Sequence, residues 1–187
     1  MKYIVRKAFW DYEKEEKWLN EMSAKGLALT DYSWCRYVFE ETPQNEYTYR
    51  IELLENLPTH AESIAYIKFL EESGIEYVAS YIRWIYIRRK SSDGVFDIYS
   101  DADSKIKHYK RVNTLWSALM WSEFVIGISN IIAGVEDVDK TNIWNSLNYI
   151  NLFSGIFLVM IGLLFFRLGS PIRKKIRRLQ QEKVIIE

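Results

Sequence analysis

One carboxylate, Glu123, stands in the middle of an apolar run, LWSALMWSEFVIGISNIIAG, that covers residues 115–134. An acid inside such a run can carry protons or ions, or it can form hydrogen bonds that hold helices together. A relay needs several titratable groups in line, and this run holds only one. We therefore favour packing and keep a proton or ion site as the alternative. The other residues expected at the same helix contact are Gly127, Asn130, Asn148, Asn151 and Ser154.

Other chemistry-bearing residues do not form recognised motifs. The sequence has no HExxH, CxxC, GxSxG or glycine-rich phosphate loop. His60 and His108 have no metal ligands near them in sequence. We interpret the acid pairs as solvated helix or turn faces, and they are Glu15/Glu16, Glu40/Glu41 and Glu71/Glu72. We expect no catalysis, no cofactor and no metal site.

The charges divide the chain into unlike regions. The 25 basic and 25 acidic residues cancel, which argues against a nucleic-acid-binding protein. Charge is dense over residues 1–111, sparse over 112–168, and basic in the tail. Cys35 is the single cysteine, which excludes an intrachain disulfide and fits a reducing compartment. The first residues lack the apolar core of a signal peptide.

The charged region contains the same order of predicted elements twice. Residues 2–9 predict a strand, and Asp11 begins a helix that stops at Gly26 before two more strands. Residues 46–54 predict the next strand, followed by a helix capped by Thr59 and two strands. We predict an α+β domain of duplicated strand–helix–strand–strand units over 1–99, with both helices on one face of a shared antiparallel sheet. The alternative is a ferredoxin-like domain with an extra hairpin.

Aromatic residues are frequent in the predicted strands. Because strand side chains alternate, some should pack under the helices and others should lie on the opposite face. Such a face could bind a ligand or a partner, or its rings could simply stabilise the sheet as cross-strand pairs. The candidate ligand or partner residues are Trp34, Tyr47, Tyr49, Tyr81, Trp84 and Tyr86.

Two apolar runs are long enough to span a membrane as helices. Basic residues flank both runs on their outer sides, and the acidic connection has one lysine, which places both termini in the cytoplasm. A short connection would bring Asn151 or Ser154 level with Glu123, and Asn145 level with Asn130. The predicted order after the domain is a basic juxtamembrane helix (100–111), transmembrane helix (112–134), short extracytoplasmic turn (135–142), transmembrane helix (143–168) and basic cytoplasmic tail (169–187).

The chain resembles a bacterial family known as domain of unknown function 2812. The resemblance is carried by EKEEKWLNEMSAKGLAL, YVFEETPQNEYTYRIELL, YIRWIYIRRK, FDIYSDADSKIKHYKR and the two spans. It implies a membrane protein of mostly Gram-positive bacteria, often encoded beside a PadR-type repressor, and hence a role in an inducible stress or drug response. The duplicated units also resemble small-molecule sensor domains of the GyrI type, which is an analogy of fold.

These observations lead to a functional expectation. We expect a regulatory or sensor protein of the bacterial cell membrane, without catalysis, whose cytoplasmic domain binds a small amphipathic ligand or a protein partner. The alternative is a structural accessory subunit of a membrane complex such as a transporter. Expected partners are membrane lipid, a membrane protein or a second copy of the chain, and not nucleic acid.

Overall fold

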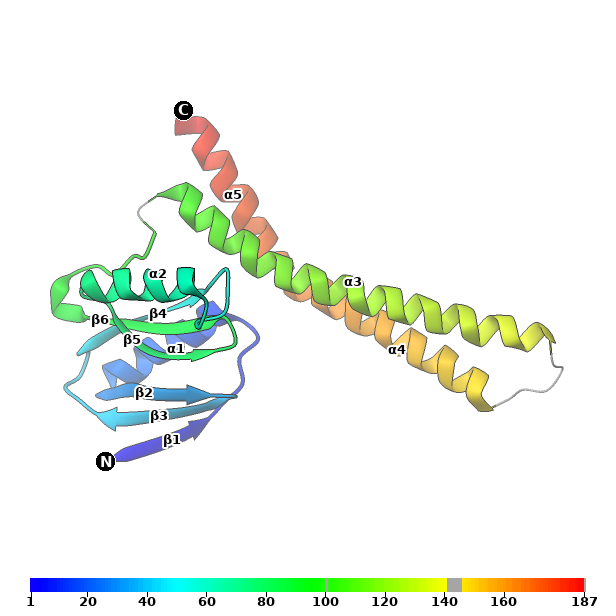
Figure 1. Ribbon diagram of the computed structural model, residues 1–187, viewed down its shortest axis with the longest axis horizontal. Helices are drawn as coiled ribbons and strands as arrows, with labels where there is room; N and C mark the ends of the chain where they lie inside the picture. The colour runs from blue at the N-terminus through cyan, green and yellow to red at the C-terminus, as the bar shows by residue number, and fades with distance from the viewer. Residues whose placement is uncertain (100, 141–145, 187) are drawn as a thin grey trace. The chain divides into compact units, whose positions relative to one another are not determined.

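In a computed structural model, the described backbone covers residues 1–99, 101–140 and 146–186, and side chains are described for 1–99, 101–135 and 148–183. The chain forms two compact units, Met1–Asp101 and Ala102–Glu187. Figure 1 shows the elements of each unit. The predicted class, a duplicated α+β domain followed by two long apolar helices, is confirmed.

The first unit repeats one order of elements, strand–helix–strand–strand. The first repeat contains β1 (Lys2–Arg6), α1 (Tyr12–Ala24), β2 (Leu27–Ser33) and β3 (Arg36–Glu41). The second contains β4 (Tyr47–Leu53), α2 (Ala61–Glu72), β5 (Glu76–Tyr81) and β6 (Trp84–Lys90). A short 3₁₀ helix, η1 (Ser91–Asp93), follows β6.

The strands form two antiparallel sheets, ordered β1-β3-β2 and β4-β6-β5, so the expected single shared sheet is wrong. The register breaks between Leu29 and Asp31 in β2 and between Tyr77 and Ala79 in β5. Such irregularities bend an edge strand and interrupt its hydrogen-bonding row. The two sheets are joined through side chains instead, since Arg88 Nη1 donates to the carbonyl of Leu29 at 3.1 Å.

The two helices do not share one sheet face. Tyr86 of β6 packs in a core with Leu19 and Met22 of α1, whereas its neighbours Ile85 and Ile87 pack with Leu70 of α2. Adjacent strand residues point to opposite faces, so α1 and α2 cover opposite faces of the second sheet. The expectation of one covered face is therefore wrong. The continuous apolar run WIYI in β6 is the pattern of a strand buried on both sides.

The ends of both helices follow local chemistry. Asp11 caps α1 by accepting a hydrogen bond from the amide of Glu13 at 3.0 Å. The predicted cap of α2 is one residue off: His60, not Thr59, occupies that position, and its Nδ1 accepts from the amide of Glu62 at 3.3 Å. After α1, Gly26 has φ +78°, the left-handed conformation that suits glycine.

The second unit consists of α3 (Ala102–Lys140), α4 (Ser146–Leu168) and α5 (Ser170–Ile186). Two helical stretches, Ala102–Val135 and Asn148–Lys183, are long and apolar enough to cross a membrane. Helix α3 is continuous through the predicted juxtamembrane helix and first span and into the predicted turn. Residues 141–142 of that turn lie outside the described residues.

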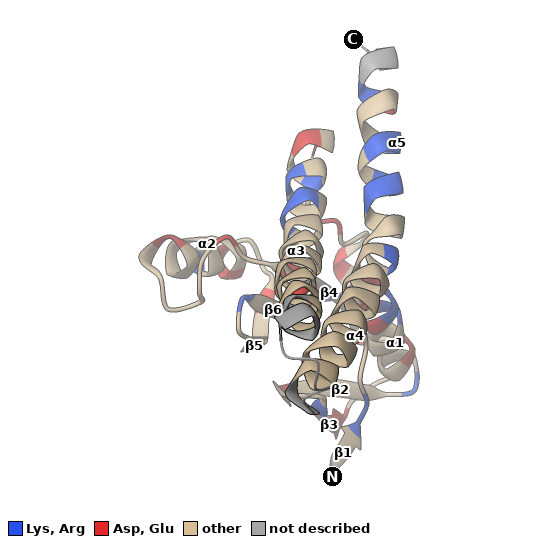
Figure 2. Ribbon diagram, turned by 90° about the vertical axis from the view of Figure 1, so that its right-hand side faces the viewer, with Lys and Arg blue, Asp and Glu red and all other residues tan. Residues whose placement is uncertain are grey.

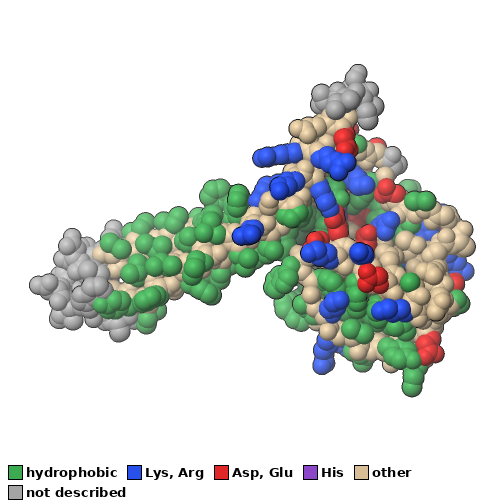
Figure 3. All heavy atoms as spheres, turned by 180° about the vertical axis from the view of Figure 1, so that it is seen from behind, with side chains coloured by type: hydrophobic (Ala, Val, Ile, Leu, Met, Phe, Trp, Pro, Cys, Tyr) green, Lys and Arg blue, Asp and Glu red, His purple; other side chains and the backbone are tan. Residues whose placement is uncertain are grey.

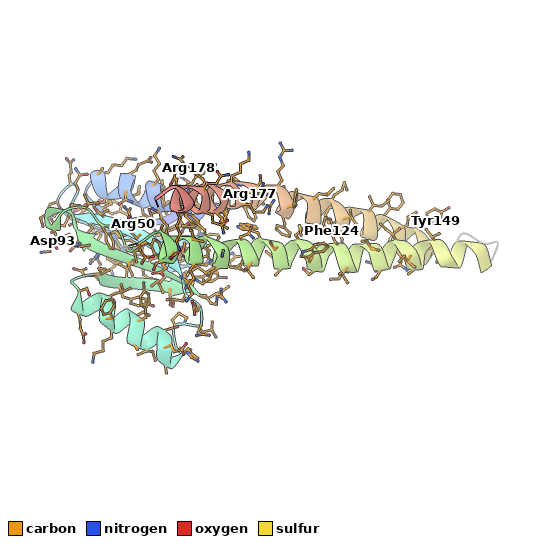
Figure 4. All side chains as sticks on the ribbon, turned by 90° about the horizontal axis from the view of Figure 1, so that it is seen from above. Arg50, Asp93, Phe124, Tyr149, Arg177 and Arg178 are labelled. Atoms are coloured by element: carbon orange, nitrogen blue, oxygen red, sulfur yellow. The ribbon has the colours of Figure 1, made fainter. Side chains whose placement is uncertain are left out.

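Hydrophobic and basic surfaces are separated along this unit. Hydrophobic side chains cover the α3–α4 hairpin on the face seen in Figure 3, and Lys and Arg gather on α5 (Figures 2 and 3). Arg177 and Arg178, labelled in Figure 4, belong to α5. Lys183 of α5 also pairs with Asp103 of α3 at 2.8 Å. The basic tail is therefore a helix that packs against the start of α3.

Candidate functional site

Two buried acids of the first unit accept hydrogen bonds from tyrosine hydroxyls: Glu52, which is 3% exposed and accepts from Tyr66 at 2.8 Å, and Glu15. Glu15 of α1 is 7% exposed, and the hydroxyls of Tyr37 (β3) and Tyr86 (β6) donate to its Oε1 at 2.6 Å and 2.7 Å. Burial raises the pKa of Glu15, and the two hydroxyl bonds oppose that rise. The site joins both repeats, because its groups come from α1, β3 and β6.

Sequence analysis assigned Glu15 to a solvated face, and that assignment is wrong. Glu15 precedes Leu19 and Met22 by four and seven residues, which places all three on one helix face. The structure buries that face against the strands. The spacing alone was therefore a signal that Glu15 points inward, and the adjacent Glu16 obscured it.

Tyr32 covers this group from the side of β2. Its half-buried ring lies 4.7 Å from the ring of Tyr37 and 4.4 Å from that of Tyr86, measured between centroids. It also contacts Tyr81 at 6.0 Å, and Tyr81 contacts the exposed Trp34 at 5.7 Å. A series of aromatic rings thus runs from the buried carboxylate to the surface.

The tyrosines remain hydroxyl donors. Burial is the main cause that raises the pKa of Tyr37 and Tyr86, and the neighbouring Glu15 raises both further. Two features of the site would attract a cation: the negative charge of the ionised carboxylate, and the negative ring faces of the nearby tyrosines, two of which meet Glu15 through their hydroxyls. The arrangement therefore suits a positively charged, partly apolar molecule better than an anion.

Glu16, the neighbour of Glu15, forms hydrogen bonds that join α1 to β4. Its carboxylate accepts from the amide of Ile51 at 3.0 Å and from Arg50 Nη1 at 3.1 Å. One turn further on, Asn20 accepts from the amide of Tyr49 at 2.8 Å and donates to its carbonyl at 3.2 Å.

Ser23 completes this row on α1. Its Oγ donates to the carbonyl of Tyr47 at 2.6 Å and accepts from the amide of the same residue at 3.3 Å. Glu16, Asn20 and Ser23 therefore saturate the outer edge of β4 at alternate residues. This contact explains why polar residues accompany Trp18 and Leu19 in the stretch WLNEMSAKG.

The six aromatic candidates do not form one open face. Tyr49 and Tyr86 are buried, and Tyr49 accepts a hydrogen bond from the amide of Leu29 at 2.8 Å. Tyr47 lies under the Arg88 guanidinium at 3.9 Å, and Trp84 contacts Tyr12 at 5.2 Å.

Three of those candidates belong to the series of rings that runs from the buried carboxylate to the surface. Tyr86 contacts Glu15 directly, and Tyr81 and Trp34 follow through Tyr32. Glu15, Tyr32 and Tyr37 were not among the candidates predicted from the sequence. Within the described part of the chain, no three or more His, Cys, Asp or Glu side chains are placed to hold a metal ion.

The candidate packing residues of the second unit bring α3 and α4 close together. Asn130 Nδ2 lies 3.4 Å from Ser154 Oγ. A Cβ added to Gly127 would be 2.9 Å from the carbonyl oxygen of Gly155, so these helix backbones are almost in contact. Gly134 packs as closely against the backbone around Asn148 and Leu152.

The expected register of this hairpin is wrong by about two helical turns. Ser154 is level with Asn130 rather than with Glu123. Phe124, which is adjacent to Glu123 and is labelled in Figure 4, instead packs against Gly162. The reason is that α3 continues to Lys140, which moves the crossover toward the C-terminus. Asn145, expected opposite Asn130, lies outside the described residues.

Glu123 has an unusual environment within the hairpin. Its Oε2 is buried and has no hydrogen-bond partner in the described part of the chain, and the same is true of Asn148 Nδ2. Asn151 contributes its carbonyl, which accepts from Ser154 Oγ at 3.0 Å. The six packing candidates thus lie on the two helices of the hairpin, but only Asn130 and Ser154 join across it by a side-chain hydrogen bond in that part.

Fold and site together define a class: a small α+β domain made of two strand–helix–strand–strand repeats, followed by helices that are apolar enough to span a membrane. Within that class the chain belongs to a protein family of unknown function, domain of unknown function 2812, whose profile matches residues 11–121. The match includes the whole Glu15 site and ends inside α3. Neither a curated protein nor a solved structure matches the chain.

Proposed function

We propose that this chain is a membrane-anchored regulatory protein whose N-terminal unit binds a small amphipathic cation and performs no catalysis. The observation that carries the proposal is Glu15, a carboxylate removed from water and enclosed by Tyr32, Tyr37 and Tyr86. A buried charge is costly to keep without a partner, and two neutral hydroxyls compensate it only in part. A bound cation would complete that compensation.

Ring contacts supply the apolar side of the proposed recognition. Tyr32 is the half-buried ring between Glu15 and the surface, so it is the side chain that a ligand would displace. The rings of Tyr81 and Trp34 continue the path outward. The proposed ligand therefore has a cationic centre that bears aromatic or aliphatic groups. Its positive charge would pair with the carboxylate of Glu15.

The membrane anchor is the second part of the proposal. The apolar windows of the two candidate spans are 17% and 11% buried, unlike helices in the core of a soluble protein. Basic residues precede the first run and follow the second: they are Lys105, Lys107, Lys110, Arg111, Arg173, Lys174, Lys175, Arg177 and Arg178. By the positive-inside rule, both termini lie in the cytoplasm of a bacterial cell.

Ligand binding is tested with two probes of similar shape and opposite charge. Tetraphenylphosphonium and tetraphenylborate are titrated into the full chain in detergent micelles, with tyrosine and tryptophan fluorescence as the readout. We expect saturable binding of the cation only, weakened at least about tenfold by Glu15→Gln, which corresponds to about 1.4 kcal/mol.

The matched control is Glu21→Gln, which removes one exposed charge from the same helix and should leave the affinity unchanged. Equal binding of both probes, or equal affinity of the wild type and Glu15→Gln, would overturn the ligand proposal. Orientation is tested separately in intact cells of a Cys35→Ser chain: a cysteine at Asp137 should react with a membrane-impermeant thiol reagent and one at Ser91 should not.

A further inference from the structure

Four connections meet at one end of the first unit. They are the β1–α1 loop, the β2–β3 turn, the β4–α2 loop and the β5–β6 turn (Figure 1). Backbone bonds join them in pairs: the amide of Lys7 donates to the carbonyl of Cys35 at 2.9 Å, and the amide of Leu54 donates to the carbonyl of Arg83 at 2.8 Å. The contact between Trp34 and Tyr81 joins the two turns to each other.

Each of these connections exposes a large apolar side chain. Trp10 is 71% exposed, Trp34 73%, Leu57 54% and Ile82 64%. We call these four residues the aromatic tip. Single exposed apolar residues are ordinary, but one from each of four adjoining connections indicates a surface that meets an apolar partner.

Backbone conformation adds an independent argument. Ile82 has φ +56° in the β5–β6 turn. A β-branched residue is a rare outlier there, and glycine or asparagine would form the same turn at less cost. The equivalent turn after β2 places Cys35 at φ +57°, next to Trp34. Turn formation alone therefore does not account for an exposed isoleucine at position 82.

We propose that the aromatic tip inserts into the headgroup region of a lipid bilayer. This surface shares Trp34 with the proposed ligand path, but its insertion does not depend on ligand binding. Tryptophan favours the boundary between apolar and polar layers of a membrane, because its ring is apolar and its N–H is polar. Ile82 and Leu57 would enter the acyl boundary beside it.

The positive charge at this end favours a membrane with anionic headgroups as the partner of the tip. Four basic residues lie in or beside these loops, namely Arg6, Lys7, Arg36 and Arg83. Three acids lie there as well: Asp11 caps α1, Asp31 pairs with Arg36 at 3.5 Å, and Glu55 is the third, so this end carries a net charge of +1. Basic groups near an apolar tip add attraction to anionic headgroups.

The apolar helices of the same chain would keep the first unit close to a bilayer. Residues 91–101 join β6 to α3, the first helix that is apolar enough to cross a membrane. Phe96 is buried in the core beside α2 and Ile98 packs against it, so only residues 99–101 connect the packed part of the first unit to α3, a reach of about 10 Å. The first unit therefore stays near the membrane surface once α3 is inserted, and weak insertion of the tip is enough to hold it there.

Cys35, the single cysteine, lies beside Trp34 and reports on the tip. The full chain is labelled there with a nitroxide and reconstituted into nanodiscs that contain phosphatidylglycerol. Electron paramagnetic resonance then compares relaxation by oxygen, which concentrates in lipid, with relaxation by a polar nickel chelate. The control is the Cys35→Ser, Gln44→Cys chain, because Gln44 is exposed in the β3–β4 loop at the other end of the strands.

We expect oxygen to relax the label at Cys35 more strongly than the nickel chelate, and the reverse at Gln44. Trp34→Ser with Ile82→Asn should return the Cys35 label to the polar pattern, without unfolding, because both side chains are exposed. As the nitroxide adds bulk, unlabelled protein gives a second measure: brominated lipid should quench wild-type fluorescence more than that of Trp34→Tyr. Equal chelate access at positions 35 and 44, together with equal quenching, would overturn the proposal, including the case in which the tip binds a protein instead.

Discussion

Helices α1 and α2 occupy equivalent places in the two repeats, between a first strand and a hairpin, and each is followed by a glycine with positive φ. Their surroundings differ. Helix α1 lies against strands of both repeats: Leu19 and Met22 fill the main core, and Glu16, Asn20 and Ser23 saturate the edge of β4. Helix α2 packs on the outer face of one sheet through Leu70 and its half-buried neighbours.

The comparison extends to the buried acid. Aligning Gly26 with Gly74 places Glu15 opposite Ser63, and both side chains are buried. Ser63 Oγ donates to the carbonyl of Asn56 at 3.4 Å, which satisfies a small neutral group locally. Glu15 instead brings a titratable group into a shared tyrosine cluster. The first repeat thus places a buried acid where the second has a small neutral group, and Tyr86 of the second repeat completes the site around that acid.

The largest difference between the helices should appear in their apolar contacts. Leu19→Ala should lower the free energy of unfolding by about 2–5 kcal/mol, because Leu19 is fully buried and a cavity remains. Ile67→Ala, at the equivalent place in α2, should cost about 1 kcal/mol because Ile67 is only half-buried. Urea unfolding of the full chain in micelles, followed by tyrosine fluorescence, measures both. Similar losses would show that the two helices contribute alike.

The two glycines provide a smaller contrast at matched backbone angles. Alanine at either position adopts the left-handed region at a cost of about 1–2 kcal/mol. A Cβ at Gly26 would also lie 2.8 Å from the carbonyl oxygen of Thr42, whereas nothing lies within 4 Å at Gly74. Gly26→Ala should therefore destabilise the fold by about 2–4 kcal/mol. Gly74→Ala should cost only the strain of the backbone conformation, about 1–2 kcal/mol. If thermal melts in micelles show equal shifts, the tight contact after α1 is not important.

Asn20→Ala tests the hydrogen bonds between α1 and the edge of β4. This change leaves the amide of Tyr49 without its side-chain partner, whereas the carbonyl keeps the bond from Arg50 Nη1 at 3.1 Å, so we expect a loss of about 1–3 kcal/mol. Lys68→Ala, at the equivalent place in α2, removes an exposed ion pair with Glu72 and should change stability by less than about 0.5 kcal/mol. Hydrogen exchange adds a local readout, since the Tyr49 amide should lose protection only in Asn20→Ala.

Element order was predictable from sequence because periodicity, caps and glycines are local. The same reasoning failed at two places where distant residues decide the outcome. Sheet pairing joins residues far apart in the chain, and the register irregularities in β2 and β5 leave no local signal. The register of the α3–α4 hairpin depends on where α3 ends, and the acidic connection was predicted to be a turn although the helix continues into it as far as Lys140.

The residues of the candidate site were only partly predictable from the sequence, also because distant segments combine to form it. Tyr81, Tyr86 and Trp34 were selected for being aromatic, but composition does not distinguish a buried ring from an exposed one. Glu15 was dismissed because it stands beside Glu16, although helical spacing placed the two on different faces. The contribution of Tyr37 required the pairing of β3 with its neighbours. What sequence lacked was therefore the combination of two repeats, since no single segment contains the site.

The smallest expected effect concerns the pH dependence that Glu15 gives to one repeat and Ser63 cannot give to the other. Burial raises the pKa of Glu15 in the folded chain above its value of about 4.3 in the unfolded chain. The folded state then holds its proton more tightly, so this stabilising contribution is complete below about pH 4.3 and is lost as pH rises through the folded pKa.

Glu15→Gln keeps an acceptor for Tyr37 and Tyr86 but has no proton to lose. The urea midpoint of the wild type should therefore fall relative to that of Glu15→Gln as pH rises from about 4.3. Burial also raises the pKa of Glu16, but Glu16 is present in both proteins and cancels in the difference. Tetraphenylphosphonium should reduce the gap by pairing with the ionised Glu15. A gap that is independent of pH, or one that favours the wild type at high pH, would mean that Glu15 is charged at little cost in the free protein, and the difference between the repeats would then be one of packing alone.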